Sequence, residues 1–203
     1  LFSEKLLAAV DREIQRAKKP VLFIGGGVNI SDSGKLAVKL AEKTQIPIVS
    51  SLMGLGAIPS SHPLFLGMLG MHGTYAANKA VHKADLLICL GVRFSDRVTG
   101  RVSGFSPKSK KIQVDIDPAE INKIVEVDFP ITGDVYNFLL QLQAVAAESE
   151  HDDWVSSVTS WKRTVPGIRD SKSLLKPQEI LQMLNKYKND ISAVATDVGQ
   201  HQM

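Results

Sequence analysis

Residues able to bind a phosphorylated ligand gather after short apolar runs in this 203-residue sequence. Three consecutive glycines, Gly25, Gly26 and Gly27, follow one such run, and a segment without side chains lets a ligand approach the backbone closely. Two arginines, Arg93 and Arg97, follow another run. Guanidinium groups pair with phosphate through parallel hydrogen bonds, so these residue types indicate a ligand that carries phosphate.

Acidic and apolar side chains complete the candidate site. Carboxylates accept hydrogen bonds from ribose hydroxyls or adenine, and Met and Leu side chains can cover a flat ring. Besides the three glycines and two arginines, the candidates are Ser51, Leu52, Met53, Gly91, Val92, Asp96, Asp115, Ile116 and Asp134. The combination predicts a nucleotide.

Each of these features also has an ordinary structural explanation, and the residues alone leave both open. Three glycines in a row can form only a tight turn, and the Arg93, Asp96 and Arg97 side chains can form a surface ion cluster. Met53 and Met71 can fill gaps in a core. The dinucleotide fingerprint of spaced glycines followed by an acidic residue is absent, which disfavours a nicotinamide dehydrogenase.

The sequence contains no pattern for catalysis or metal binding. A catalytic triad, a zinc pattern and a Walker loop are all missing, so we predict no catalytic residue and no metal ligand in this chain. We expect His72 to be a hydrogen-bonded loop residue and Cys89 to be an inert thiol in a buried strand. Trp154 and Trp161, seven residues apart, are expected to pack a helix against the fold.

Alternating strand and helix patterns must position these residues. Helices are expected over residues 3–18, 33–44, 74–83 and 135–147, and strands over residues 20–24, 46–49, 85–90, 111–115 and 129–132. Residues 50–73, rich in Gly and Met, are expected to form one long functional loop. The apolar run at 20–24 has no polar alternation, which is typical of a parallel strand covered on both faces.

The order of these elements predicts an α/β fold: a doubly wound, mainly parallel six-stranded Rossmann-like sheet with helices on both faces. In such sheets, ligands bind outside the carboxyl ends of the strands. Every candidate residue follows a predicted strand, so we expect the fold to gather them at one edge.

Three segments are expected along the chain. Residues 1–149 form the nucleotide-binding domain, residues 150–176 a polar linker with a helix, and residues 177–203 the start of a further domain with a strand at 191–195. The chain begins at Leu1 and ends at Met203, shortly after this strand-like run. We therefore expect it to be an excised segment of a larger protein.

The composition is that of an ordinary globular chain, with 44% hydrophobic and 22% charged residues. A net charge of +3 without a run of like charges argues against nucleic acid as a partner. The longest apolar runs fall far short of the ~20 residues of a membrane-spanning helix, so no membrane partner is expected. A single cysteine suits a reducing compartment, and we predict a cytoplasmic protein.

Five motifs together resemble the large catalytic subunit of the acetohydroxyacid synthase family, also called acetolactate synthase. They are Ser-Leu-Met-Gly-Leu-Gly at 51–56, Met-Leu-Gly-Met-His-Gly-Thr at 68–74, Gly-Val-Arg-Phe-Ser-Asp-Arg-Val-Thr-Gly at 91–100, Asp-Ile-Asp-Pro-Ala-Glu-Ile at 115–121 and Val-Gly-Gln-His-Gln-Met at 198–203. The resemblance extends from about residue 20 to residue 203. It implies that residues 1–149 are the central, FAD-binding domain of a thiamine diphosphate-dependent enzyme, and that residues 177–203 are the truncated start of its C-terminal thiamine diphosphate-binding domain.

The resemblance also implies a place for each part of FAD. The glycines Gly25 to Gly27 would approach the cofactor backbone, and Ser51, Leu52 and Met53 would line its middle. The flavin would lie near Leu69, Gly70, Met71 and His72. The phosphates and the flavin end of the cofactor would be held by Arg93, Asp96 and Arg97. The adenosine would contact Asp115, Ile116, Asp134 and Val135. The beginning of a thiamine diphosphate site would be Val198, Gly199, Gln200 and His201.

The family reaction decarboxylates pyruvate on thiamine diphosphate and joins the remaining two-carbon unit to a second pyruvate or to 2-oxobutyrate. The products, 2-acetolactate or 2-aceto-2-hydroxybutyrate, enter branched-chain amino-acid biosynthesis. Because the reaction involves no net redox change, the resemblance implies a structural role for FAD. It places the catalytic glutamate and the Mg ligands outside this chain, so we predict that the chain alone is inactive.

Partners and alternatives follow from the same resemblance. The implied partners are the missing N- and C-terminal domains, further copies in a homodimer or tetramer, and a small regulatory subunit. One alternative is the scaffold domain of an FAD-independent catabolic acetolactate synthase, against which the run at 93–100 argues. Another is a non-catalytic nucleotide-binding module, against which the run at 198–201 argues, because it makes sense only as the start of a thiamine domain.

Overall fold

The computed structural model describes residues 1–162, 177–187, 189–195 and 199. The chain divides into two compact units, residues 1–165 and residues 166–203, and each is treated separately below. In the part of the chain that is described, no helix is both long enough and apolar enough to span a bilayer.

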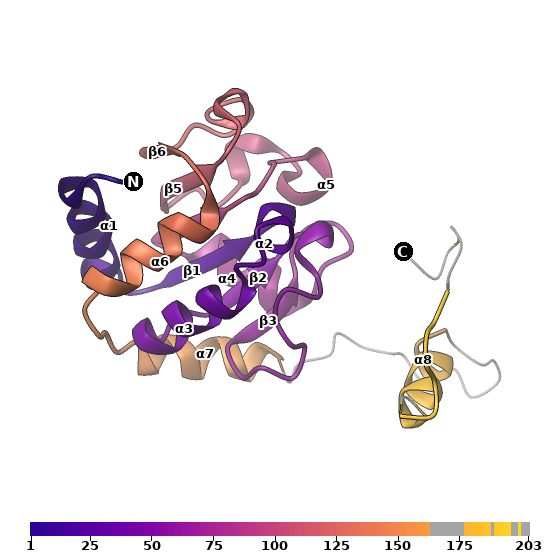
Figure 1. Ribbon diagram of the computed structural model, residues 1–203. Coiled ribbons are helices and arrows are strands. Elements are labelled where there is room, and N and C mark those ends of the chain that lie inside the picture. Colours follow the sequence, from indigo (N-terminus) through magenta and orange to yellow (C-terminus); the bar gives the residue numbers. More distant parts are fainter. Residues whose placement is uncertain (163–176, 188, 196–198, 200–203) are drawn as a thin grey trace. The chain divides into compact units, whose positions relative to one another are not determined.

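The first unit is built on a six-stranded sheet in which every pairing is parallel (Figure 1). The strands are β1 (Pro20–Ile24), β2 (Ile48–Ser50), β3 (Phe65–Met68), β4 (Leu86–Leu90), β5 (Lys110–Asp115) and β6 (Phe129–Thr132). Their order across the sheet is β3-β2-β1-β4-β5-β6. Strand order reverses between β1 and β4, which is where ligands bind in sheets of this topology.

Helices cover both faces of the sheet, which confirms the predicted doubly wound fold (Figure 1). One face packs against α1 (Glu4–Arg16), α3 (Gly34–Thr44) and α6 (Val135–Val145), and the other against α4 (Tyr75–Lys83) and α7 (Asp152–Lys162). Successive side chains of β4 alternate between the two cores: Leu86 and Ile88 belong to the first, and Leu87 and Cys89 to the second. Burial on both sides explains why β1 and β4 are continuously apolar.

Side-chain caps define the starts of α1, α4 and α6. Ser3 accepts a hydrogen bond from the Leu6 amide at the start of α1, Thr74 from the Ala77 amide at α4, and Asp134 from the Asn137 amide at α6. Each bond satisfies an amide that has no partner within its helix. The four helices predicted in the first 149 residues are confirmed, with ends that differ by one or two residues.

Several short elements lie at the strand ends. They are α2 (Gly26–Ile30), η1 (Leu52–Gly54), α5 (Asp96–Thr99), η2 (Val102–Gly104) and η3 (Pro118–Glu120). The glycine run, for which a tight turn was one of two open explanations, begins the short helix α2. The prediction of one uninterrupted loop over residues 50–73 is wrong, because β3 pairs with β2 inside it.

Helix α7 belongs to the first unit. The Trp154 indole Nε1 donates a hydrogen bond to the Pro20 carbonyl oxygen at 2.9 Å, and the Trp154 ring meets the Trp161 ring edge to face at 5.6 Å. The Lys79 ammonium of α4 lies 4.4 Å from the centre of the Trp161 ring, within range of a cation–π contact. The tryptophans therefore pack a helix, as predicted, while the domain boundary at residue 149 stays a prediction.

The described part of the second unit contains one helix, α8 (Pro177–Lys186), whose Ile180, Leu181 and Leu184 side chains are exposed. Residues 191–195 form no strand, so that prediction is wrong. A strand needs a neighbouring strand to accept and donate its backbone hydrogen bonds, and the described residues of this unit supply none.

Candidate functional site

The loops after β1 and β4 meet at the point where strand order reverses. The Gly25 amide donates to the Leu90 carbonyl oxygen at 2.9 Å, and the Gly27 amide donates to the Gly91 carbonyl oxygen at 3.1 Å. The Gly91 amide in turn donates to the Val114 carbonyl oxygen of β5 at 2.8 Å. These bonds fix the backbone at the base of the predicted site.

Glycines allow these two loops to touch. A Cβ atom on Gly25 would lie 2.1 Å from the Gly91 carbonyl oxygen, and one on Gly27 would lie 2.6 Å from the Gly91 Cα. A Cβ on Gly26 would instead approach the Met53 side chain at 3.2 Å. Contact within the protein therefore already requires Gly25 and Gly27, and their predicted approach to a cofactor stays a prediction.

Large apolar side chains stand exposed around this edge of the sheet. Leu52 and Met53 after β2 and Met71 after β3 are each 68% exposed, and Ile116 after β5 is 72% exposed. Single exposed apolar residues are normal on proteins, but a group of them at one edge of a sheet indicates a binding surface. The sequence predicted these four residues as ligand contacts, and the fold brings their loops to one edge.

Two guanidinium groups are exposed at the same edge. Arg93 follows β4, and Arg97 lies in α5, where its side chain is 70% exposed. The Arg97 Nε lies 3.8 Å from the Asp96 Oδ2, and Asp96 is itself 85% exposed, so this ion pair is weak and leaves the guanidinium available. His72, also exposed, lies in the loop that carries Met71.

Other predicted residues point away from solvent. Leu69, Val92 and Val135 are almost fully buried in the two cores, so their side chains cannot contact a ligand at the surface. The hydroxyl of Ser51 accepts from the Gly54 amide, and the Asp134 carboxylate caps α6. These residues shape the loops at the edge.

Asp115, at the end of β5, is a buried carboxyl group that accepts hydrogen bonds from the backbone. It is 8% exposed, and its Oδ1 accepts a hydrogen bond from the Asp117 amide at 3.0 Å. Burial raises the pKa of Asp115 above its ordinary value, although the hydrogen bond from Asp117 opposes this effect.

The raised pKa predicts how stability depends on pH. The folded protein holds the Asp115 proton more tightly than the unfolded chain, so stability falls as pH rises from the ordinary pKa of an aspartate through the raised value. Asp115→Asn keeps the acceptor for Asp117 but does not titrate. We expect this variant to be more stable than the wild type at pH 7 in urea unfolding, with the difference vanishing at low pH. The exposed control Asp96→Asn should show no such pH-dependent gain, and a gain equal to that of Asp115→Asn would contradict the assignment.

The predicted thiamine diphosphate residues lie at the end of the chain. Val198, Gln200 and His201 lie outside the described residues, and Gly199 is described only as a bend. Burial raises the pKa of the Cys89 thiol far above its ordinary value, which agrees with an inert cysteine. Among the residues that the structure describes, no three His, Cys, Asp or Glu side chains group as a metal site.

Three amide side chains that the sequence analysis did not select hold the loops at this edge. Asn29 of α2 donates to the carbonyl oxygens of Met53 and Leu55. Gln113 of β5 donates to the carbonyl oxygens of Val92 and Glu120, and Asn78 of α4 bonds to Gly70. An asparagine inside a helix is a usable signal, because its side chain competes for backbone hydrogen bonds.

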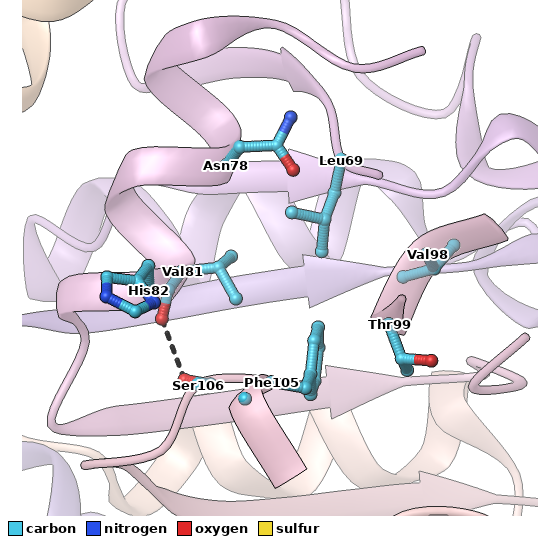
Figure 2. A pocket seen from close by; sticks show the side chains of 9 residues that line it. Leu69, Asn78, Val81, His82, Val98, Thr99, Phe105 and Ser106 are labelled. Carbon is cyan, nitrogen blue, oxygen red and sulfur yellow. Dashed lines mark hydrogen bonds between the residues drawn. The ribbon is translucent and has the colours of Figure 1, made fainter. Parts of the chain in front are cut away.

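A small hollow lies between α4 and the α5–η2 segment (Figure 2). Its volume is about 150 Å³, and its walls include Leu69, Asn78, Val98, Thr99 and Phe105. Sites that enclose a drug-sized ligand measure about 300–1,000 Å³, so a dinucleotide does not fit here. The open edge of the sheet is the better candidate.

Comparison with known proteins identifies the family of this chain. Residues 7–142 match the family model described as "Thiamine pyrophosphate enzyme, central domain". The chain is 44% identical over 200 residues to a probable acetolactate synthase large subunit of Methanocaldococcus jannaschii, an alignment that covers 94% of this chain and 34% of the relative. It is 45% identical over 197 residues to the acetolactate synthase large subunit of Corynebacterium glutamicum (94% and 32% covered) and 42% identical over 206 residues to acetolactate synthase 1, chloroplastic, of Zea mays (98% and 32% covered). The chain spans about a third of the length of the curated relatives it matches.

Proposed function

This chain belongs to the family of thiamine pyrophosphate enzyme central domains, and from that premise we propose that it serves as the central domain of an acetolactate synthase and binds FAD at the carboxyl edge of its sheet. One observation carries the proposal. The exposed apolar side chains and the two exposed arginines follow neighbouring strands around the β1–β4 switch point. The names of the relatives support the choice of enzyme over the catabolic-scaffold and isolated-module alternatives.

The residues at this edge fit the chemistry of FAD. A flavin ring and an adenine ring are flat and largely apolar, and Leu52, Met53, Met71 and Ile116 can cover such surfaces. A diphosphate is anionic, and Arg93 and Arg97 can neutralise it. The close contact of Gly27 with Gly91 keeps side chains out of the space between β1 and β4.

In this proposal the chain binds and orients the cofactor and does not react with it. FAD can accept and donate electrons when bound, but the proposed synthesis of acetolactate has no net redox step. The chain's own tasks are to hold the ring between apolar side chains, to pair with the diphosphate, and to present a rigid sheet edge. This role agrees with an edge that is rich in arginine, leucine and methionine.

The proposal extends to the intact enzyme. Thiamine diphosphate and Mg²⁺ would be bound mainly by the N- and C-terminal domains of the longer protein. Further copies in a homodimer or tetramer and a small regulatory subunit would complete the cytoplasmic enzyme. The coverage of one third of each relative supports the existence of further domains in those relatives.

A chimaera tests the proposed function. We expect the 203-residue chain alone, supplied with pyruvate, thiamine diphosphate, Mg²⁺ and FAD, to form no acetolactate. The same chain in place of the matching third of the Corynebacterium glutamicum relative should give a yellow protein that forms acetolactate from pyruvate. A chimaera that folds and binds thiamine diphosphate but is colourless and inactive would contradict the proposal, as would turnover by the isolated chain.

A further inference from the structure

The loop between β3 and α4, residues 69–73, is held by one amide side chain together with backbone hydrogen bonds to Ser50 and Arg97. The Asn78 Oδ1 accepts a hydrogen bond from the Gly70 amide at 3.2 Å, and the Asn78 Nδ2 donates to the Gly70 carbonyl oxygen at 3.0 Å. The same Nδ2 lies 3.1 Å from the Thr74 carbonyl oxygen. Asn78 thus bonds to both polar backbone groups of Gly70, as a neighbouring strand would.

Gly70 also joins this loop to the arginine-bearing segment. Its φ of +110° favours glycine, and a Cβ there would lie 2.4 Å from the Arg97 carbonyl oxygen. The next residue, Met71, donates its amide to that same oxygen at 2.8 Å. The backbone that carries Met71 and the backbone that carries Arg97 therefore meet at Gly70.

Side-chain packing at this junction is incomplete, although Leu69 is buried and Val98 packs against the same core. The hollow of about 150 Å³ lies beside it, with Asn78 and Leu69 on one side and Val98 and Thr99 on the other (Figure 2). Atoms that border a void have no packing partners on that side. Hydrogen bonds therefore add to this packing in holding the β3–α4 loop against α5.

We propose that Asn78 is a positioning residue of the FAD site: it holds Gly70 so that Met71 and Arg97 are presented together to the cofactor. That Met71 and Arg97 are presented to FAD rests on the proposed function. That Asn78 holds the loop at Gly70 does not depend on it. Asn78 touches neither ring nor phosphate in this account, because its hydrogen bonds go to the loop.

The variant Asn78→Asp tests the positioning role by replacing the side-chain amide with a carboxylate. The aspartate keeps the acceptor for the Gly70 amide but turns the two donated bonds into repulsion between oxygen atoms. The matched control is Asn137→Asp, which places the same charge on an exposed side chain in the first turn of α6. Both variants are studied as the full 203-residue chain, with FAD as the probe.

Two readouts are expected to change together. In Asn78→Asp, amide hydrogen exchange at Met71 and Gly73 should become about tenfold faster, while exchange at Leu22 in β1 stays as in the wild type. The Kd for FAD should rise about tenfold, and the visible circular dichroism of the bound flavin should change. Asn137→Asp should match the wild type in all of these.

Unchanged exchange at Met71 and Gly73 in Asn78→Asp would overturn the inference. A loosened loop with an unchanged Kd for FAD would also overturn it. If the wild type shows no saturable binding of FAD, the proposed function fails, and the positioning of the loop by Asn78 is then decided by the exchange rates alone.

Discussion

Gly91→Ala is expected to lower the free energy of unfolding by about 3–5 kcal/mol, a large share of the 5–15 kcal/mol typical of a domain. Gly91 has a φ of +57°, which costs other residues about 1–2 kcal/mol. A Cβ there would also lie 2.5 Å from the Gly27 Cα. The start of α2 and the loop after β4 would have to separate, and their contact forms the base of the candidate site.

Gly100→Ala is the matched control for this prediction. Gly100 has a nearly identical φ of +55°, but a Cβ there meets no atom within 4 Å. With a ψ of −130°, Gly100 also has a backbone conformation that favours glycine, but the clash is absent, and we expect a loss of about 1–3 kcal/mol. Urea unfolding of both variants checks the difference, and equal losses would show that the contact between Gly27 and Gly91 does not limit packing.

Replacing Arg93 and Arg97 together with glutamine is expected to weaken FAD binding about 100-fold. A hydrogen bond to a charged group contributes about 1.5–3 kcal/mol, so each arginine is expected to contribute about tenfold, after allowance for exposure to solvent. Neither side chain is buried, and the fold should therefore survive. Titration of FAD into the double variant, followed by flavin fluorescence, measures the loss.

The control for the arginine pair removes two positive charges at another place on the surface. Arg12 and Arg16, both on α1, are exposed. Changing this second pair to glutamine should alter the Kd for FAD by less than about threefold at physiological salt, because distant charges are screened. A similar weakening in both pairs would mean that overall charge, and not contact with the diphosphate, controls binding.

Most of the sheet could be predicted from the sequence because its strands are buried on both faces. Apolar runs such as residues 20–24 and 86–90 have no other stable place in a folded chain. Strand β3 could not be predicted in the same way. It has four residues, one of them is Gly67 with a φ of +103°, and its place is determined by pairing with β2. Local preference carries no information about such a partner.

The residues at the site could be predicted better than their roles. Position after a predicted strand was enough to select Met53 and Arg97, since parallel strands all end at one edge. Met71 was selected through the family resemblance, because the strand before it was not predicted. Burial was not visible in the same pattern, so Leu69 and Val92 were grouped with the exposed residues. Asn78 was overlooked because its importance comes from contact with Gly70, eight residues away, and from the loop geometry there.

Titration of FAD into the wild-type chain tests the central claim most directly. The exposed apolar side chains and the arginine pair at the carboxyl edge predict a saturable change in flavin fluorescence that is lost at least in part when Arg93 and Arg97 are replaced. The absence of any saturable change in the wild-type chain, under conditions where circular dichroism shows the fold intact, would contradict the claim that this sheet edge is an FAD site.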